Sequence, residues 1–144
     1  MITKLSIRNF KSIKELDIDC ARVNLFIGEP NTGKSNILEA LGLLSWCGSR
    51  SKDILLSDFV RFEYISNLFY DDLTDQIVKV SIASEKMLIN LGLGIGSQSK
   101  SPKIYYGQFP EQKNEKILSL ATKYQSDLDE GKYTEDLSKF EKLL

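Results

Sequence analysis

Histidine is absent from this sequence of 144 residues, and cysteine is rare. Without imidazole, the chain has neither Ser-His-Asp nor Cys-His catalytic chemistry, and it has no His-ligated metal site. Its two cysteines, Cys20 and Cys47, are too few for a disulfide framework or a metal cluster. We therefore expect both cysteines to serve as small apolar residues.

The sequence also lacks a charge excess and any long apolar run. Its 19 basic and 20 acidic residues give a net charge of -1, so no overall positive field attracts nucleic acid. Because no run is long enough for a bilayer and Met1 leads directly into an alternating pattern, we expect no membrane span, no signal peptide and a cytoplasmic location. A hydrophobic fraction of 42% is typical of a globular domain with one core.

Apolar periodicity predicts the first elements. Residues 5–20 alternate between apolar and polar types around a turn at residues 9–12, which predicts an antiparallel hairpin. Residues 23–27 are apolar with little alternation, which predicts a strand buried on both faces of a parallel or mixed sheet. Residues 33–47 carry apolar side chains at helical spacing and predict a helix.

The rest of the chain is less uniform. Residues 53–70 mix both periods and are assigned to a short helix and a strand. Residues 78–83 and 87–93 alternate and predict a second hairpin, with a further strand at residues 103–106. Residues 111–144 carry two helical stripes, so they are predicted to form a helical extension.

The segment GEPNTGKSN, residues 28–36, fits the phosphate-loop (Walker A) pattern G-x-x-x-x-G-K-[ST] between a predicted strand and a predicted helix. Backbone N–H groups of such a loop surround phosphate oxygens, and the helix N-terminus adds partial positive charge. Lys34 is expected to reach the β and γ phosphates, and the Ser35 hydroxyl to bind Mg²⁺. The predicted phosphate-binding residues are Gly28, Asn31, Thr32, Gly33, Lys34, Ser35 and Asn36.

Two segments, ITKLSIRNFKSIKELDI and VNLFIGEPNTGKSNILEAL, resemble the amino-terminal part of ABC-type ATPase heads of the RecF, SMC and OLD group, within the AAA family of ATPases. The resemblance covers about residues 1–45, and Asn36 and Glu39-Ala40 favour this group over GTPases and kinases. Such loops often have glycine where this chain has Asn31, and Pro30 removes one N–H donor, so the strength of binding is expected to differ.

The resemblance implies a P-loop NTPase of the α/β class: an ABC-ATPase-like mixed sheet with helices, in an incomplete, amino-terminal half. Residues 1–110 form the nucleotide-binding core, and residues 111–144 form the helical extension. In similar heads the first hairpin turn lies against the bound nucleotide, which implies that Lys11 and Ser12 contact phosphate or ribose. From the residues alone, Lys11 is equally a solvated turn lysine. Gln108 is the one candidate for a γ-phosphate sensor, with a surface loop amide as the alternative.

Hydrolysis of ATP requires groups that the sequence does not supply. An aspartate after an apolar strand holds Mg²⁺ from a second side, and a carboxylate or similar group orients the attacking water. Residues 54–58 come closest to an apolar strand that ends in such an aspartate, but Phe59 follows where the family has an acidic residue. The acidic residues 126–130 lie on a helical pattern that favours a solvated face, and no L-S-G-G-like signature is present.

Two functions therefore remain open. The first is Mg²⁺-ATP binding, with Lys34 acting in catalysis, by part of an ATPase that works on DNA in repair, maintenance or phage defence. Its site would be completed in a homodimer or by a second half of the head. The second is a module that binds nucleotide without hydrolysing it and serves as a switch or remnant. Contact with DNA has weak support, because loop residues such as Arg50, Lys52, Lys100 and Lys103 are dispersed and fit a solvated surface.

Overall fold

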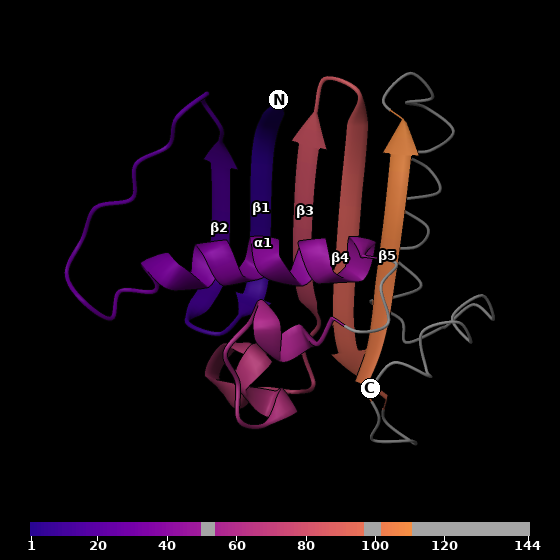
Figure 1. Cartoon of the computed structure of the whole chain (residues 1–144). Helices are drawn as coiled ribbons and strands as arrows, with labels where there is room; N and C mark the ends of the chain where they lie inside the picture. Colours follow the sequence, from indigo (N-terminus) through magenta and orange to yellow (C-terminus); the bar gives the residue numbers. More distant parts are fainter. Residues whose placement is uncertain (50–53, 97–101, 111–144) are drawn as a thin grey trace.

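The computed structural model describes residues 1–49, 54–96 and 102–110 and shows one helix lying across one face of a five-stranded sheet (Figure 1). The strand order is β2-β1-β3-β4-β5, and every neighbouring pair is antiparallel. The strands are β1 (Ile2–Phe10), β2 (Ile13–Asp19), β3 (Val78–Ser84), β4 (Met87–Ile95) and β5 (Pro102–Pro110). The helix is α1 (Lys34–Gly48), and three short 3-10 helices follow it: η1 (Leu56–Asp58), η2 (Ile65–Leu68) and η3 (Tyr70–Asp72).

Both predicted hairpins are present. In the first, the register pairs Leu5 with Ile18 and Ile7 with Leu16, as the alternating pattern predicts. Its turn places Asn9 and Lys11 at positive φ values of 54° and 51°. This conformation is common for asparagine and unusual for lysine, so Lys11 is held in place by other contacts. The second hairpin joins β3 to β4, and β5 extends the predicted strand at residues 103–106 in both directions.

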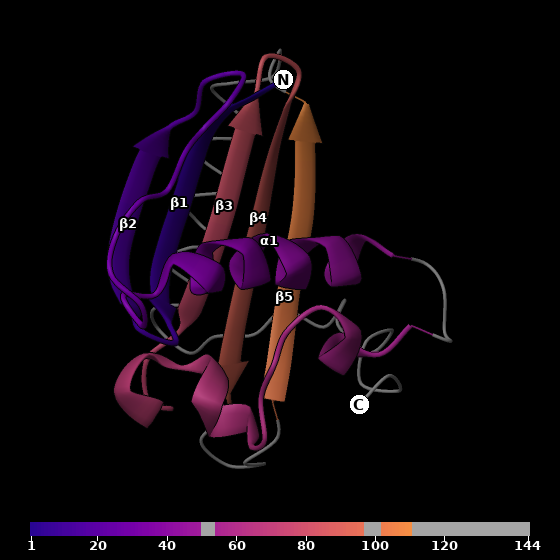
Figure 2. The same ribbon diagram turned by 60° about the vertical axis from the view of Figure 1, so that its left-hand side comes forward.

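The core lies between α1 and the sheet. The buried positions of α1 are Ile37, Glu39, Ala40, Leu43, Leu44 and Cys47, and all but Glu39 belong to the apolar cluster. They pack with inward-facing strand residues such as Ile7, Val80 and Leu93, which are fully buried. The helix axis crosses all the strands when viewed from the front and lies against a single face when the molecule is turned (Figures 1 and 2). The described residues thus form two layers, a helix on one face of an antiparallel sheet, and they include no parallel strands of the predicted α/β class.

The segment after α1 differs from the prediction. Residues 53–70 were expected to hold a short helix and a strand, but the described part from residue 54 forms 3-10 turns and a single bridge between Phe69 and Phe10. Phe69 is 1% exposed, and the Lys11 N–H donates to the Leu68 carbonyl at 3.2 Å. Mixed periodicity arises because apolar side chains are buried one at a time by irregular turns.

Residues 23–27 are the main correction to the predicted fold. They form no strand, and Val23, Leu25 and Ile27 are 82%, 80% and 84% exposed. The segment runs outside β2 as an extended connection to the loop (Figure 1). A strand buried on both faces needs neighbouring strands and a layer on each side, and the described residues supply neither to this segment. The described sheet is therefore antiparallel, whereas a mixed sheet was predicted.

Several predictions fall outside the described residues. These are the helical extension at residues 111–144, the acidic stretch at residues 126–130, and the loop cations Arg50, Lys52 and Lys100. Among the described residues, no helix has the length and apolar character that crossing a membrane requires.

Candidate nucleotide-binding site

The phosphate loop joins the exposed segment at residues 23–27 to the first residue of α1. Gly33 caps the helix with φ 84° and ψ 7°, in the left-handed region that glycine adopts without strain. Asn31 also has positive φ, at 63°, as expected for a residue that replaces glycine in a tight turn. These two positions allow the backbone to curl directly before the helix begins.

Lys34 fills the centre of this curl. Its Nζ atom donates hydrogen bonds to the carbonyl oxygens of Gly28 at 2.8 Å and Glu29 at 2.5 Å, and to the Thr32 hydroxyl at 3.1 Å. The Thr32 hydroxyl in turn donates to the Glu29 carbonyl at 2.8 Å. The loop is thus closed around an ammonium group whose present partners are all neutral. An anion would form stronger, charge-assisted hydrogen bonds with the same group.

The start of α1 has the features of an anion site. Its first turn holds no acidic residue, and Gly33 provides no side-chain cap. The Asn36 N–H donates to the Gly33 carbonyl at 3.0 Å, and the N–H groups of Lys34 and Ser35 have no backbone partner among the described residues, so these two remain available. Ser35 is exposed, and its hydroxyl has no hydrogen-bond partner among the described residues. The Ser35 hydroxyl is suited to serve as one ligand of Mg²⁺. No group of three or more acidic or cysteine side chains in the described part could hold a metal ion, so further ligands would come from phosphate, water or another part of the protein.

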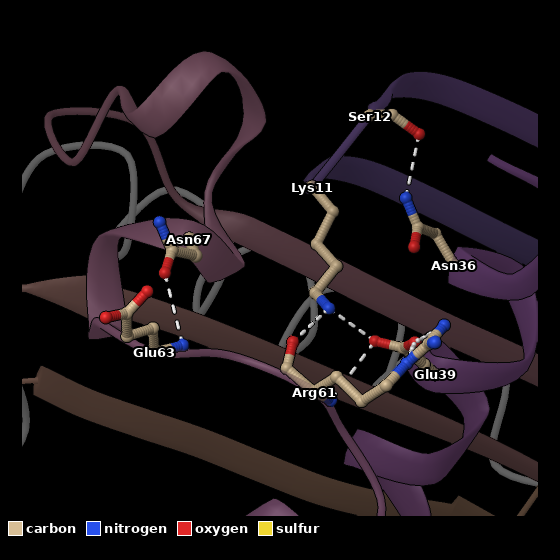
Figure 3. A network of polar contacts seen from close by, with 7 residues as sticks. All are labelled: Lys11, Ser12, Asn36, Glu39, Arg61, Glu63 and Asn67. Carbon is tan, nitrogen blue, oxygen red and sulfur yellow. Dashed lines mark hydrogen bonds and ion pairs between the residues drawn. The ribbon is translucent and has the colours of Figure 1, made fainter. Parts of the chain in front are cut away.

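The turn between β1 and β2 is packed against this helix start. Ser12 Oγ accepts a hydrogen bond from the Asn36 side-chain amide at 2.8 Å (Figure 3). A Cβ atom on Gly33 would collide with the same hydroxyl oxygen, so only glycine allows this approach. The structure therefore brings Ser12 together with the loop residues, although Ser12 and Asn36 are 24 residues apart in sequence.

Lys11 points in a different direction from Ser12. Its ammonium group donates to the Glu39 carboxylate on α1 and to the Arg61 carbonyl (Figure 3). The Lys11 side chain is 13% exposed and forms an ion pair with Glu39. Lys11 is thus neither the solvated turn lysine of the sequence analysis nor, in this arrangement, a group directed at the loop.

Glu39 is a site residue whose contacts sequence reasoning did not predict. It is 7% exposed, and its Oε1 atom accepts from Arg61 Nε at 2.8 Å and lies 2.7 Å from a second guanidinium nitrogen of Arg61, while Lys11 binds Oε2. Burial alone raises the pKa of Glu39, but the hydrogen bonds from Lys11 and Arg61 outweigh burial and lower it. A signal was available, because Glu39 lies one helical turn before the buried Leu43 and so falls on the apolar face.

Gln108 is not brought to the loop. It lies on β5, at the opposite edge of the sheet from β2, and its amide donates to the Tyr106 hydroxyl. That hydroxyl is 2.9 Å from the position a Cβ atom on Gly48 would take, at the carboxyl end of α1. Lys34 lies at the other end of the helix, about 20 Å away at 1.5 Å per residue. The expected setting, a strand followed by a loop, is instead the interior of a strand that continues to Pro110.

Asp58, the residue that comes closest in sequence to an acidic magnesium ligand, has a local structural role. Asp58 ends η1, is exposed, and accepts a hydrogen bond from the Leu55 backbone N–H at 3.0 Å. Within the described residues, no strand leads directly into it. Its carboxylate therefore caps a turn.

Comparison with known proteins agrees with these features. A family model described as an AAA ATPase domain matches residues 1–143. The chain is 31% identical over 88 residues to the DNA replication and repair protein RecF of Leptospira interrogans serovar Lai, a match that covers 56% of this chain and 23% of that protein. It is 32% identical over 80 residues to the RecF protein of Phocaeicola vulgatus, covering 53% of this chain and 21% of the relative. A shorter match, 45% over 42 residues, links it to the RecF protein of Lactobacillus acidophilus and covers 28% of this chain and 11% of that protein.

These matches concern only part of the relatives, since the chain spans less than a quarter of their length. The family model, in contrast, extends over nearly the whole chain. The chain belongs to the AAA ATPase domain family and is similar to the amino-terminal part of RecF-like P-loop ATPases.

Proposed function

We propose that the chain binds Mg²⁺-ATP on the loop at residues 28–36, as the amino-terminal part of a RecF-like ATPase head. The observation that carries the proposal is the Lys34 ammonium group, held by neutral loop oxygens at the uncapped start of α1. Phosphate oxygens arriving here gain an ammonium donor, backbone N–H groups and the positive end of a 15-residue helix. Ser35 provides a hydroxyl for Mg²⁺.

The parent protein is proposed to hydrolyse ATP in a DNA-related process. This step rests on family membership and on the names of the relatives, which are DNA replication and repair proteins. Lys34 would stabilise the negative charge that develops on the transferred phosphoryl group. The carboxylate that binds Mg²⁺ from a second side and the group that orients water would come from a part of the head beyond this core.

The exposed segment at residues 23–27 supports such a completion. Its side chains Val23, Leu25 and Ile27 are exposed by 80% or more, although the sequence pattern is that of a central strand. A strand from the second half of the head, or from another copy of the chain in a homodimer, would cover these side chains and fix the backbone directly before Gly28. Completion of the sheet and ordering of the loop would then occur together.

Isothermal titration of the purified chain with ATP and MgCl₂ tests the binding step. Replacement Lys34→Ala should weaken binding about 10- to 100-fold, since charge-assisted hydrogen bonds contribute about 1.5–3 kcal/mol. The matched control is Lys14→Ala, which removes an exposed lysine from β2. Equal affinity of both variants and the wild type, or no binding by any of them, would overturn the proposal.

A second candidate function is binding without hydrolysis, favoured by the local role of Asp58 as a turn cap. Phosphate release by the chain alone separates the two candidates. Binding with no Mg²⁺-dependent release indicates a binding module or an incomplete head. Release that is lost in Lys34→Ala indicates that the chain itself hydrolyses ATP.

A further inference from the structure

An open cavity of about 510 Å³ lies beside the β1–β2 turn. None of the loop residues 28–36 lines it. The turn forms one wall, and the segment that contains η2 and η3 forms the other. The residues that line it are Lys11, Ser12, Asn67, Phe69, Tyr70, Asp71 and Asp72. The cavity lies within the volume range of small-molecule sites.

Ser12 connects this cavity to the phosphate loop. The residue lines the cavity, and its hydroxyl oxygen is held by Asn36 and lies against Gly33 at the start of α1. Ser12 is therefore shared by the cavity lining and the helix start, so the two lie next to each other. The hydrogen bond from the Lys11 N–H to the Leu68 carbonyl, at 3.2 Å, fixes the turn against the opposite wall.

The charges of the lining select the kind of group that enters. Asp71 and Asp72 contribute two carboxylates, and the one lysine of the lining is already paired with Glu39. Such a surface repels phosphate and attracts groups that donate hydrogen bonds without bearing negative charge. Sugar hydroxyls are groups of this kind, and carboxylates bind ribose hydroxyls in dinucleotide-binding folds. The half-buried Tyr70 provides an aromatic face for a base.

The two carboxylates differ in their contacts. Asp72 Oδ1 accepts a hydrogen bond from the Asn67 amide at 3.2 Å, and Asn67 is itself held by the N–H groups of Glu63 and Tyr64. The Asp71 carboxylate is exposed and has no hydrogen-bond partner among the described residues. Both aspartates have positive φ, 54° and 55°, a conformation that costs energy and here presents the two side chains at the cavity edge.

We propose that this cavity takes the nucleoside part of the nucleotide whose phosphates lie on the loop. Asp71 accepts hydrogen bonds from the ribose hydroxyls, and the Tyr70 ring packs against the base. The inference rests on the proposed function, because the phosphate loop anchors the ligand. It adds a specificity site in η2 and η3, which lie outside the sequence motif.

Comparison of ATP with inorganic tripolyphosphate, each with MgCl₂, tests the inference by calorimetry. Wild type should bind ATP at least about 10-fold more tightly than tripolyphosphate, since stacking of a base on an aromatic ring contributes about 1–3 kcal/mol. Tyr70→Ala and Asp71→Gly should each lower ATP affinity about 10-fold and leave tripolyphosphate affinity unchanged. Glycine tolerates the positive φ of residue 71, so the second variant removes the carboxylate without backbone strain.

Three controls make the outcome decisive. Tyr64→Ala removes an exposed tyrosine that does not line the cavity and should change neither affinity. Wild type should bind 2′,3′-dideoxy-ATP more weakly than ATP. The Asp71→Gly variant should bind the two nucleotides with equal affinity. Thermal unfolding of each variant checks that the fold is retained.

Equal affinities of wild type for ATP and tripolyphosphate would overturn the cavity assignment and leave the phosphate site in place. Equal losses for both ligands in the variants would overturn it as well, because the effect would then be on the fold or the loop. Binding of neither ligand by wild type would overturn the proposed function and this inference together.

Discussion

At the residue scale, Glu39 brings a negative charge to a position that is 7% exposed. Three segments meet at this carboxylate: the β1–β2 turn through Lys11, the loop after η1 through Arg61, and α1 itself. A buried carboxylate that loses such partners is costly, because its remaining charge has no compensation. Glu39 therefore fixes the turn that carries Ser12 to the start of α1.

The lowered pKa of Glu39 predicts a pH-dependent stability. Because the carboxylate binds its proton less readily in the folded than in the unfolded chain, it contributes stability above its ordinary pKa, and this contribution is lost as pH falls through the folded value. Glu39→Gln should lower the free energy of unfolding by about 1–3 kcal/mol at pH 7. Urea unfolding as a function of pH measures this, and the difference from wild type should shrink toward acidic pH. A difference that is constant with pH would show that the charge of Glu39 is unimportant.

The two cysteines are predicted to differ in reactivity. Burial raises the pKa of the Cys47 thiol to about 12, so its reactive thiolate is scarce at neutral pH. Cys20 is only partly buried. Alkylation of the native protein with iodoacetamide should label Cys20 first, with Cys47 labelled only after unfolding, as measured by mass spectrometry of peptides. Comparable labelling of both in the native state would contradict the burial of Cys47 on the sheet-facing side of α1.

At the element scale, α1 has two tasks: its apolar face holds the sheet, and its first turn forms the phosphate site. The helix N-terminus is exposed where the loop arrives, while Leu43 and Leu44 in its middle are buried in the core. Gly42 lets η1 approach closely, because a Cβ atom there would lie 2.9 Å from the Phe59 carbonyl oxygen. The packing of the helix therefore determines where its first turn lies.

Truncation of a side chain should be costly on the buried face of α1 and nearly neutral on its exposed face. Leu43→Ala removes a side chain that is 0% exposed and should lower the free energy of unfolding by about 2–5 kcal/mol. Leu38→Ala, at a position that is 65% exposed, should change it by less than about 0.5 kcal/mol. Denaturant titrations followed by far-UV circular dichroism compare the two. Similar losses would indicate that Leu38 is covered in solution.

At the scale of the whole molecule, the exposed segment at residues 23–27 stands apart from the rest of the described structure. In the strands, most apolar side chains reach the core, and Val80 on β3 is 0% exposed, whereas Ile2 and Met87 at strand ends are each 39% exposed. Here three large apolar side chains face solvent next to the loop that is proposed to bind ATP. Several exposed apolar side chains in one short segment are typical of an interaction surface.

A matched pair of substitutions checks this exposure. Val23→Thr, at a position that is 82% exposed, should leave the free energy of unfolding within about 0.5 kcal/mol of wild type. Val80→Thr places a hydroxyl in the core and should cost about 1–3 kcal/mol. Unfolding of both variants under identical conditions is the measurement. A large loss for Val23→Thr would show that the segment is already packed in the isolated chain.

Much of this protein follows from local sequence patterns. Alternation predicted both hairpins, since a strand with one buried face repeats every two residues, and helical spacing predicted α1. The phosphate loop could be located from its motif, and Asn31, at the position where such loops often have glycine, adopts a positive φ of 63°. These features depend on residues that are neighbours in sequence, so local patterns are sufficient to predict them.

Other features depend on contacts between distant parts of the chain. Whether residues 23–27 form a strand depends on partners that a local pattern does not contain, and the described residues leave them unpaired. The opposite directions of Lys11 and Ser12, the distance of Gln108 from the loop, and the burial of Glu39 between two cations arise from contacts between segments far apart in the chain. The position of a charged side chain is set by the charges and cavities around it, and those become neighbours only when the chain folds.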